Sequence, residues 1–464
     1  MDFIPLGETD DIAASCHFLN LNGTGLVLDA GVDPRRSGPD SLPHFERIHD
    51  DPDHFVDHVF VTHAHHDHMG ALPVLVKEFP HAMIHMTEAT RILLDFLLPA
   101  SARLQQRKRR EGSMMHDPLF TEADLDGLSH LYLTHDLQQT FDVSGLSAKS
   151  PVKAQFYTAG HILGSVGTEL RFEEDGRERR VFYTSDTNLR PQSILPGGTY
   201  PDAADVLILE STLGNDEEAA ETNRYVETKR FKRTLARVLD RGGTALVPVF
   251  VMGRAQETLA LLGDLKDEGA IPRDVPIYTA GSMRAIASIY DKTRAISPRL
   301  DADFRVFDVH QERLPYGDEG TREALDGPSI IVVSSGMMFG PTISNRIARR
   351  IVENEKDAVL LVGYAVEDSP AHRLKKAAEE GPGTGVMLAE GHGPQPVYCT
   401  VESFRFSGHS NRRDLLEIVD RLAPDDVILV HGETAAREWM AENIEANHPD
   451  VTVHLPAGGE HMTV

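Results

Sequence analysis

The chain has 464 residues, of which 41% are hydrophobic and 25% are charged, a composition typical of globular proteins. Lysine and arginine together number 46 against 72 aspartates and glutamates, so the formal net charge is −26. This charge favours solubility and argues against a surface that coats nucleic acid broadly, although a local basic groove stays open. The two cysteines, Cys16 and Cys399, can build neither a disulfide framework nor a cysteine-based zinc ribbon.

The first residues lack the basic and apolar regions of a signal peptide, and no stretch is long and apolar enough to span a membrane. We therefore expect a soluble, cytoplasmic protein without a membrane partner. The length suggests about three domains.

The chain begins with a series of short strands, expected over residues 3–6, 16–19 and 25–29. The Asn22-Gly23 pair between two of them predicts a hairpin turn. Asp29 ends the third strand, where an aspartate can cap a turn. Beside a histidine site it could equally orient a ligand imidazole, and both readings stay open.

An apolar strand over residues 59–62 leads directly into a cluster of ligand-type side chains. Alternation places His63 and His65 on the same side of the chain, and Asp67 and His68 follow where the chain turns. Three imidazoles and a carboxylate within six residues are ligands suited to a borderline metal such as zinc. His66 breaks the alternation, so we do not expect it to be a ligand.

Helices predicted over residues 72–79 and 88–98 flank a strand over 82–86, a rhythm that indicates a layered α/β domain. The basic run at 107–110 is interpreted as a solvated helix face, with RNA contact as the alternative.

A second group of ligand-type residues follows strands predicted over 152–157, 168–172 and 180–183. The last two should form a hairpin at Asp175-Gly176. His161 lies between glycines and Asp186 follows a strand end. As in the first cluster, the ends of strands present side chains that can bind a metal. Together the two groups supply enough ligands for two metals. The next strand, 206–209, is wholly apolar, which predicts a buried strand, and it ends on Glu210.

The middle of the chain has a different character. A long amphipathic helix is expected over 216–241, followed by strands over 244–250, 276–279, 329–333 and 358–362 that alternate with helices. This alternation predicts a parallel sheet. Two strand-to-helix turns, 250–254 and 334–340, combine small residues with a helix N-terminus and could cradle phosphate, although such turns are common in α/β domains.

In the last seventy residues, strands again end on residues that can bind a metal, as in the first part of the chain. A strand over 404–406 leads to His409, a helix follows over 412–422, and a buried strand over 427–430 ends on His431. A helix over 434–447 and a strand over 451–455 close the chain.

Taken in order, these motifs resemble those of the metallo-β-lactamase superfamily and, within it, the β-CASP nucleases. Asp29 is similar to the first superfamily motif, and His-Ala-His-His-Asp-His to the second. The remaining matches are His161 and Asp186 for the third and fourth motifs, then Glu210, His409 and His431 for β-CASP motifs A, B and C.

The resemblance implies an α/β protein with a four-layer αββα metallo-β-lactamase fold and an inserted α/β β-CASP domain. The first part of the metallo-β-lactamase domain would span residues 1–212, the insert 213–398, and the second part of the metallo-β-lactamase domain 399–464.

The resemblance also implies a site for two Zn²⁺ ions. His63, His65 and His161 would hold one ion, Asp67, His68 and His431 the other, and Asp186 would bridge them. Two such ions support in-line attack on a phosphodiester bond. Asp67, Asp186, Glu210 and His409 would be catalytic, with Glu210 holding His409 as the proton donor. Asp29 would orient a ligand, and Arg254, Ser335 and Gly336 would bind the phosphates of the substrate.

In this family a histidine at motif C favours RNA over DNA. The implied activity is a zinc-dependent ribonuclease that cuts single-stranded RNA endonucleolytically in RNA processing or decay. The chain looks most similar to compact prokaryotic members related to the nuclease subunit of pre-mRNA 3′-end processing, and a homodimer is one option for its assembly. The alternatives are a DNA-directed nuclease, a hydrolase of a small ester or thioester, and a non-catalytic scaffold subunit. The segment 363–373 departs from the family pattern through extra acidic residues and a proline near the expected RNA path.

Overall fold

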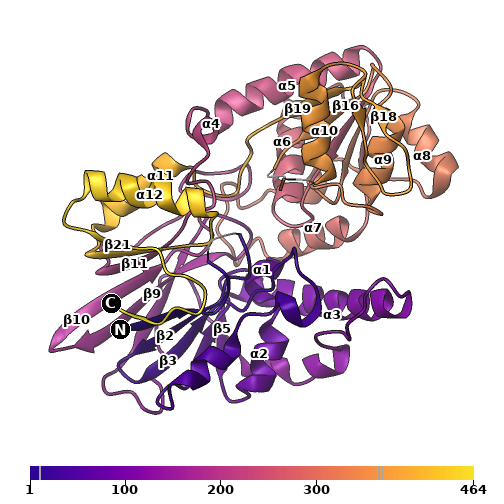
Figure 1. Ribbon diagram of the computed structural model, residues 1–464. Coiled ribbons are helices and arrows are strands. Elements are labelled where there is room, and N and C mark those ends of the chain that lie inside the picture. Colours follow the sequence, from indigo (N-terminus) through magenta and orange to yellow (C-terminus); the bar gives the residue numbers. More distant parts are fainter. Residues whose placement is uncertain (10–11, 364–365, 368) are drawn as a thin grey trace. The chain divides into compact units, whose positions relative to one another are not determined.

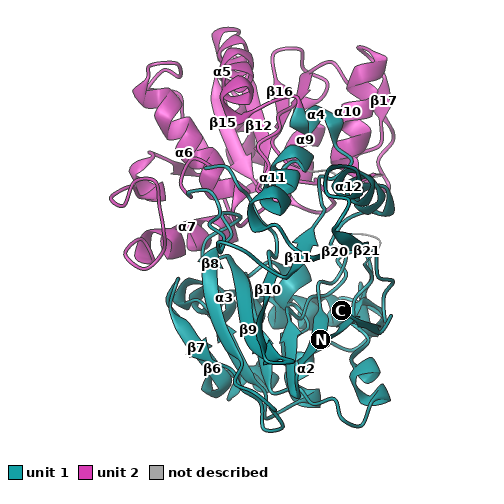
Figure 2. Cartoon of the chain, turned by 90° about the vertical axis from the view of Figure 1, so that its left-hand side faces the viewer, with its two compact units in different colours: residues 1–191, 196–220, 409–464 teal, residues 192–195, 221–408 magenta. Residues whose placement is uncertain are grey.

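The computed structural model describes residues 1–9, 12–363, 366–367 and 369–464. Contacts divide the chain into two compact units, each of which is described by itself. Unit 1 comprises residues 1–191, 196–220 and 409–464, and unit 2 comprises 192–195 and 221–408 (Figure 2). The boundaries expected from the sequence, after residues 212 and 398, stay predictions.

Unit 1 contains two seven-stranded sheets (Figure 1). The first has the order β22 (Met462–Thr463), β1 (Asp2–Pro5), β2 (His17–Leu21), β3 (Thr24–Leu28), β4 (His58–Phe60), β5 (Met83–Met86) and β6 (Tyr132–Thr134). The second has the order β21 (Thr452–His454), β20 (Asp426–Val430), β11 (Val206–Glu210), β10 (Arg177–Tyr183), β9 (Val166–Glu174), β8 (Lys153–Thr158) and β7 (Thr140–Asp142).

The two sheets pack face to face, and the alternation of side chains along β11 shows how the layers are made. Val206 and Ile208 belong to the core between the sheets, together with residues of β3 and β8. Leu207 and Leu209 face the other way and pack against α11 (Arg412–Leu422) and α12 (Thr434–Asn447). Because β11 is buried on both faces, its sequence is a continuous apolar run.

Helices α2 (Leu72–Glu78) and α3 (Glu88–Arg110) lie beside the first sheet, on the side away from the second (Figure 1). The order helix, sheet, sheet, helix confirms the predicted four-layer αββα fold. Two short helices, α1 (His66–Met69) and α4 (Glu217–Ala220), complete the α-helices of unit 1 that the structure describes.

Unit 2 contains a six-stranded sheet in which every pairing is parallel, as predicted. Its order is β14 (Glu312–Arg313), β13 (Ile277–Thr279), β15 (Ser329–Val333), β12 (Thr244–Pro248), β16 (Ala358–Leu361) and β19 (Thr400–Ser403). A small second sheet joins β17 (Gly385–Val386) to β18 (Gln395–Pro396). The described helices are α5 (Arg224–Asp240), α6 (Arg254–Asp267), α7 (Ser282–Lys292), α8 (Gly317–Leu325), α9 (Ile343–Ile351) and α10 (Pro370–Glu380).

Three predicted elements differ most from the structure in their extent. The helix expected over 216–241 is broken into α4 and α5, because the side chain of Asn223 accepts a hydrogen bond from Val226 N and starts a new helix. Helix α3 continues through Pro99 to Arg110, since the residues after the proline are strong helix formers. The strand expected over 404–406 ends at Ser403, because Arg405 N donates to the Glu227 carboxylate instead of to a neighbouring strand.

Several other sequence predictions concern the surface. The basic run at 107–110 forms the exposed last turn of α3, which confirms the solvated helix face. The atypical segment 363–373 falls partly outside the described residues. Among the helices of the described ranges, none combines the length and apolar character that a membrane crossing needs.

Candidate metal centre and active site

The parallel strands of unit 1 bring their carboxyl ends to common edges, and this positions the site. Strands β3 and β4 run in parallel, and Asp29 N donates to Phe60 O over 2.8 Å, so Asp29 lies beside the start of the histidine loop. In the second sheet β10, β11 and β20 are parallel neighbours. Asp186 therefore follows β10, Glu210 ends β11 and His431 follows β20, all at one edge of the sheet.

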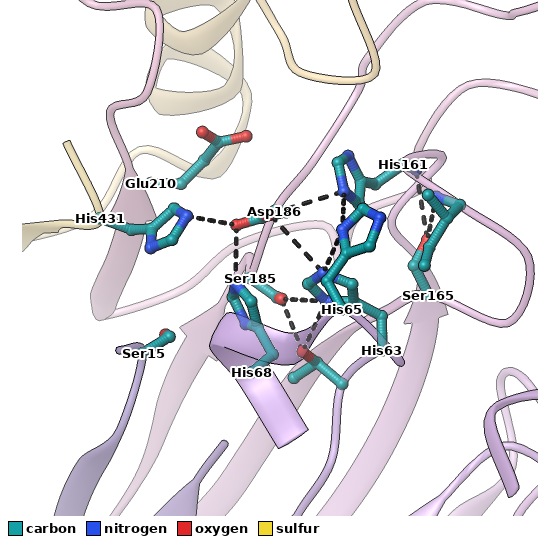
Figure 3. Close-up of polar contacts among 12 residues, drawn as sticks. Ser15, His63, His65, His68, His161, Ser165, Ser185, Asp186, Glu210 and His431 are labelled. Atoms are coloured by element: carbon teal, nitrogen blue, oxygen red, sulfur yellow. Dashed lines mark hydrogen bonds and ion pairs between the residues drawn. The ribbon is translucent and has the colours of Figure 1, made fainter. Parts of the chain in front are cut away.

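The first cluster joins His63, His65, His161 and Asp186 (Figure 3). His65 Nδ1 lies 3.2 Å from His63 Nε2 and 3.0 Å from His161 Nε2. Asp186 Oδ2 lies 3.6 Å from His63 Nε2 and 3.5 Å from His161 Nε2. One atom from each side chain thus faces a common point.

The second cluster joins Asp67, His68 and His431, and one ligand atom of each lies within 4.8 Å of the others. The other oxygen of Asp186, Oδ1, lies 3.3 Å from both His68 Nε2 and His431 Nε2. Asp186 therefore stands between the clusters, one oxygen toward each. His66 is exposed and belongs to neither.

A third group places Glu210 and His409 beside Asp186. His409 Nδ1 lies 3.1 and 3.2 Å from the two oxygens of Glu210, so this nitrogen carries the proton that the carboxylate accepts. Glu210 is only 1% exposed, and it also accepts hydrogen bonds from Thr187 N and Thr212 N. These donors hold the carboxylate in place and fix the tautomer of His409.

Asp29 makes a fully buried network beneath the second cluster. Its Oδ2 accepts from His68 Nδ1 at 2.8 Å and from Tyr183 OH at 3.0 Å, while its Oδ1 accepts from Thr62 N at 2.8 Å. The His68 ring is thereby turned so that Nε2 faces Asp186. Of the two readings left open by the sequence, the geometry favours the orienting role over a turn cap.

The charges of the site follow from burial and neighbours. Burial alone would raise the pKa of Asp186, but the nearby imidazoles of His431, His68 and His409 hold it well below its ordinary value. Burial lowers the pKa of His63 well below its ordinary value and also lowers the pKa of His65. Asp186 is therefore a carboxylate and these two imidazoles are neutral, which are the protonation states that metal ligation requires.

The donor set fits a pair of metal ions. His68 Nε2, Asp186 Oδ1 and His431 Nε2 are buried and have no hydrogen-bond partner within the described ranges of the chain, although they face one another. Buried polar atoms of a folded protein are nearly always satisfied. Imidazole nitrogens and carboxylate oxygens are preferred zinc ligands. Metal ions would satisfy these three atoms. The two-zinc assignment itself stays a prediction at this point.

Comparison with known families gives three matches in chain order. Residues 9–190 match the metallo-β-lactamase superfamily, residues 255–374 the β-CASP domain, and residues 394–456 the Zn-dependent metallo-hydrolase RNA specificity domain. The chain belongs to the β-CASP family of the metallo-β-lactamase superfamily. This superfamily is metal-dependent, in agreement with the buried histidine and aspartate clusters.

Relatives of this β-CASP protein match it along most of its length. Cleavage and polyadenylation specificity factor 73 of Drosophila melanogaster is 29% identical over 92% of this chain and 59% of its own. Endoribonuclease YSH1 of Eremothecium gossypii is 28% identical over 93% of this chain and 55% of its own. Integrator complex subunit 11 of Danio rerio is 25% identical over 99% of this chain and 73% of its own. The chain thus spans less than two thirds of the first two relatives.

The fold is also similar to a solved structure. The crystal structure of a protein of unknown function from Enterococcus faecalis V583 aligns with a TM-score of 0.57 at 12% identity. The alignment covers 100% of this chain and 99% of that one. At this identity the likeness concerns the fold alone.

The three predicted phosphate-binding residues lie in unit 2, apart in the chain from the ligand set of unit 1. Arg254 is buried, and its guanidinium donates to Phe406 O and to the side chain of Gln192. Burial lowers the pKa of Arg254 to about 10. Gly336 and Arg254 line a cavity of about 10 Å³, the size of a single water. Ser335 Oγ is buried and has no hydrogen-bond partner in the part of the chain that the structure describes. Substrate contact by these three residues stays a prediction.

The sequence reasoning missed the hydroxyl groups that support the ligands. Thr62 Oγ1 lies 2.7 Å from Ser185 Oγ and 3.2 Å from His63 Nδ1. Ser165 Oγ accepts hydrogen bonds from the backbone of His161 and Ile162. A signal for two of these residues was present in the sequence, since Thr62 and Ser185 each directly precede a predicted ligand.

We expect the Asp29→Asn variant to bind zinc about 10- to 100-fold more weakly than the unmodified protein, because His68 loses the anionic acceptor that orients it. The measurement is a zinc titration against a competing chelator. Tyr183→Phe removes only one donor to Asp29 and serves as the matched control, for which we expect a smaller loss. Equal zinc affinity in Asp29→Asn and the unmodified protein would contradict the orienting role.

Proposed function

We propose that this protein is a zinc-dependent endoribonuclease that hydrolyses phosphodiester bonds of single-stranded RNA. The observation that carries the proposal is the Glu210–His409 pair, which shares Asp186 with the metal-type clusters. Hydrolysis of a phosphodiester needs both an activated water and a proton for the departing sugar oxygen. The clusters suit the first task and the pair suits the second.

In this proposal His63, His65 and His161 hold one zinc ion, and Asp67, His68 and His431 hold the other, with Asp186 between them. When bound, the ions supply a water nucleophile at neutral pH and stabilise the charge on the reacting phosphate. Asp29 keeps the His68 ring in its ligating orientation through the 2.8 Å hydrogen bond.

His409 is the proposed proton donor. Burial alone would lower its pKa, but Glu210 and Asp186 raise it to about 9. The imidazole is therefore protonated at neutral pH and can give up a proton. Because Glu210 engages Nδ1, the transfer would take place from Nε2. Protonation of the sugar oxygen would leave a 3′-hydroxyl on one product and a 5′-phosphate on the other.

Three observations favour RNA as the substrate. His431 occupies β-CASP motif C, where RNA-directed members tend to carry histidine. The RNA specificity match covers residues 394–456, which include both His409 and His431. A relative of similar sequence is named an endoribonuclease. A DNA-directed nuclease and a small-ester hydrolase are less well supported, since the second needs neither an inserted β-CASP domain nor a buried Glu–His pair. A homodimer and a cytoplasmic location stay predictions.

A panel of substrates tests the proposal. We expect the purified protein to cut internally labelled single-stranded RNA into fragments that carry 5′-phosphates, and to leave DNA of the same sequence and a chromogenic ester intact. The lengths and end groups of the products, read on a sequencing gel, are the measurement. Faster cleavage of the DNA or the ester than of the RNA would contradict the ribonuclease assignment.

We expect His409→Ala to retain both zinc ions but to cleave RNA about 10²- to 10⁴-fold more slowly, because the proton donor is lost while the ligands stay. Elemental analysis and an RNA cleavage assay on the same preparation are the measurements. Asp67→Ala is the contrasting variant, which should lose one zinc ion together with activity. Unimpaired cleavage by His409→Ala would rule out the proton-donor role.

The pH dependence of cleavage provides a separate test. His409 must be protonated to act, so activity should fall as the pH rises through the pKa of His409. Glu210→Gln removes the carboxylate that raises this pKa. We therefore expect the alkaline limb of the pH–rate profile to move to lower pH in this variant. A profile that only scales down, with its alkaline limb unmoved, would contradict the coupling.

A further inference from the structure

A separate group of metal-type side chains lies at the outer edge of the first sheet of unit 1. Asp2, His54 and His461 each offer one ligand atom, and these atoms lie within 4.8 Å of one another. Asp2 begins β1 and His461 directly precedes β22, the strand that pairs with β1. His54 comes from the loop before β4. The first and last described residues lie side by side at this edge (Figure 1), and Met1 N donates to Val464 O.

One distance within the group matches that between two ligands of a single ion. His461 Nε2 lies 3.4 Å from Asp2 Oδ1. Two nitrogen or oxygen atoms on a tetrahedral zinc ion, each at 2.0–2.2 Å, are about 3.3–3.6 Å apart. The rings of His54 and His461 have centroids 5.8 Å apart and an interplanar angle of 76°, so they stand edge to face rather than stacked.

His54 is the anchor of the group and the residue whose placement most needs an explanation. Its side chain is only 2% exposed, and its ring packs on Phe18 in the core, 4.8 Å between centroids. Its Nδ1 is buried and has no hydrogen-bond partner among the residues that the structure describes. Its Nε2 lies 3.9 Å from Asp51 Oδ2, too far for a hydrogen bond. A buried imidazole nitrogen without a hydrogen bond to any of the described residues is unusual.

We propose that Asp2, His54 and His461 bind a zinc ion at a structural site distinct from the active-site clusters. Two imidazoles and a carboxylate are a zinc-type donor set, and water can complete the coordination. The ion would satisfy His54 and join β1, β22 and the 51–54 loop.

A metal ion at this site would stabilise a short edge strand of the first sheet. Strand β22 has only two residues, and its pairing with β1 offers few backbone hydrogen bonds. A metal bridge from His461 to Asp2 and His54 would fasten this short edge strand to the core of the first sheet. The proposal does not depend on the ribonuclease assignment, because none of the three residues belongs to the proposed active site.

Zinc stoichiometry of the full chain is the test. After the metals are removed with a chelator, the protein is incubated with excess Zn²⁺, desalted and subjected to elemental analysis. We expect about three zinc ions per chain, and about two in His461→Gln. The matched control is His44→Gln, because His44 is similarly exposed and also pairs with one carboxylate, Glu46, but belongs to none of the metal-type groups found among the described residues. It should retain about three.

A second background separates this site from the active site. In His63→Ala/His68→Ala, which damages both proposed active-site positions, the structural zinc should remain and should disappear when His461→Gln is added. Asp2→Asn should act like His461→Gln and replaces it if that variant does not fold. Zn²⁺ should also raise the thermal unfolding midpoint of the double variant, and this rise should vanish in the triple variant. Equal zinc content with and without His461→Gln in the double-variant background would overturn the proposal.

Discussion

The candidate active site depends on one buried carboxylate. Asp186 is 2% exposed, yet it carries a negative charge that faces His63 and His161 with one oxygen and His68 and His431 with the other. An isolated buried anion is very costly, so it persists only where partners compensate it. The imidazoles of the site provide that compensation. Placing them requires three segments of the chain to end at the same spot, which the parallel pairing of β10, β11 and β20 and the packing of the two sheets achieve together.

The backbone is locally strained around Asp186 and the histidines that face it. Asp29, Ser185 and His431 have φ angles of 61°, 51° and 50°, values in the left-handed region that side chains other than glycine seldom adopt. Each such residue costs on the order of 1–3 kcal/mol and persists only where the surroundings determine it. Asp29 is held by hydrogen bonds from Thr62, His68 and Tyr183. Gly31 shows how tightly the loops pass, because a Cβ atom there would meet Asp67 O at 1.7 Å.

The net charge of −26 opposes the approach of any polyanion, RNA included. At physiological ionic strength, charges beyond roughly 8 Å are largely screened, so the proposed recognition of RNA would rest on groups close to the reacting phosphate. The imidazoles and the ions they would hold are such groups. The basic turn of α3 is a second local exception to the acidic surface, although Arg109 there already pairs with Asp117.

Some of the protein follows from its sequence alone. The periodicities of buried strands and amphipathic helices predicted a layered α/β domain and the parallel sheet. The four-layer αββα arrangement was predicted from the order of motifs shared with the β-CASP family. Asn22-Gly23 and Asp175-Gly176 marked their hairpins correctly, since few other residue pairs suit those turns. The extent of α3 was missed because the strong helix formers after Pro99 continue the helix, and that of β19 because Arg405 N donates to the Glu227 carboxylate. The types of ligand residue and their order were also predictable from the sequence, because they occur in short motifs at strand ends.

Only the tertiary structure decided which atoms meet. It placed Asp186 between two clusters, turned His68 through Asp29, and engaged Arg254 with Phe406 and Gln192. It also brought His54 and His461 together with Asp2, a group without any motif. The physical reason is that a sequence records side-chain chemistry and local periodicity. The convergence of distant residues depends instead on strand register, sheet packing and buried hydrogen bonds, which exist only in the folded chain.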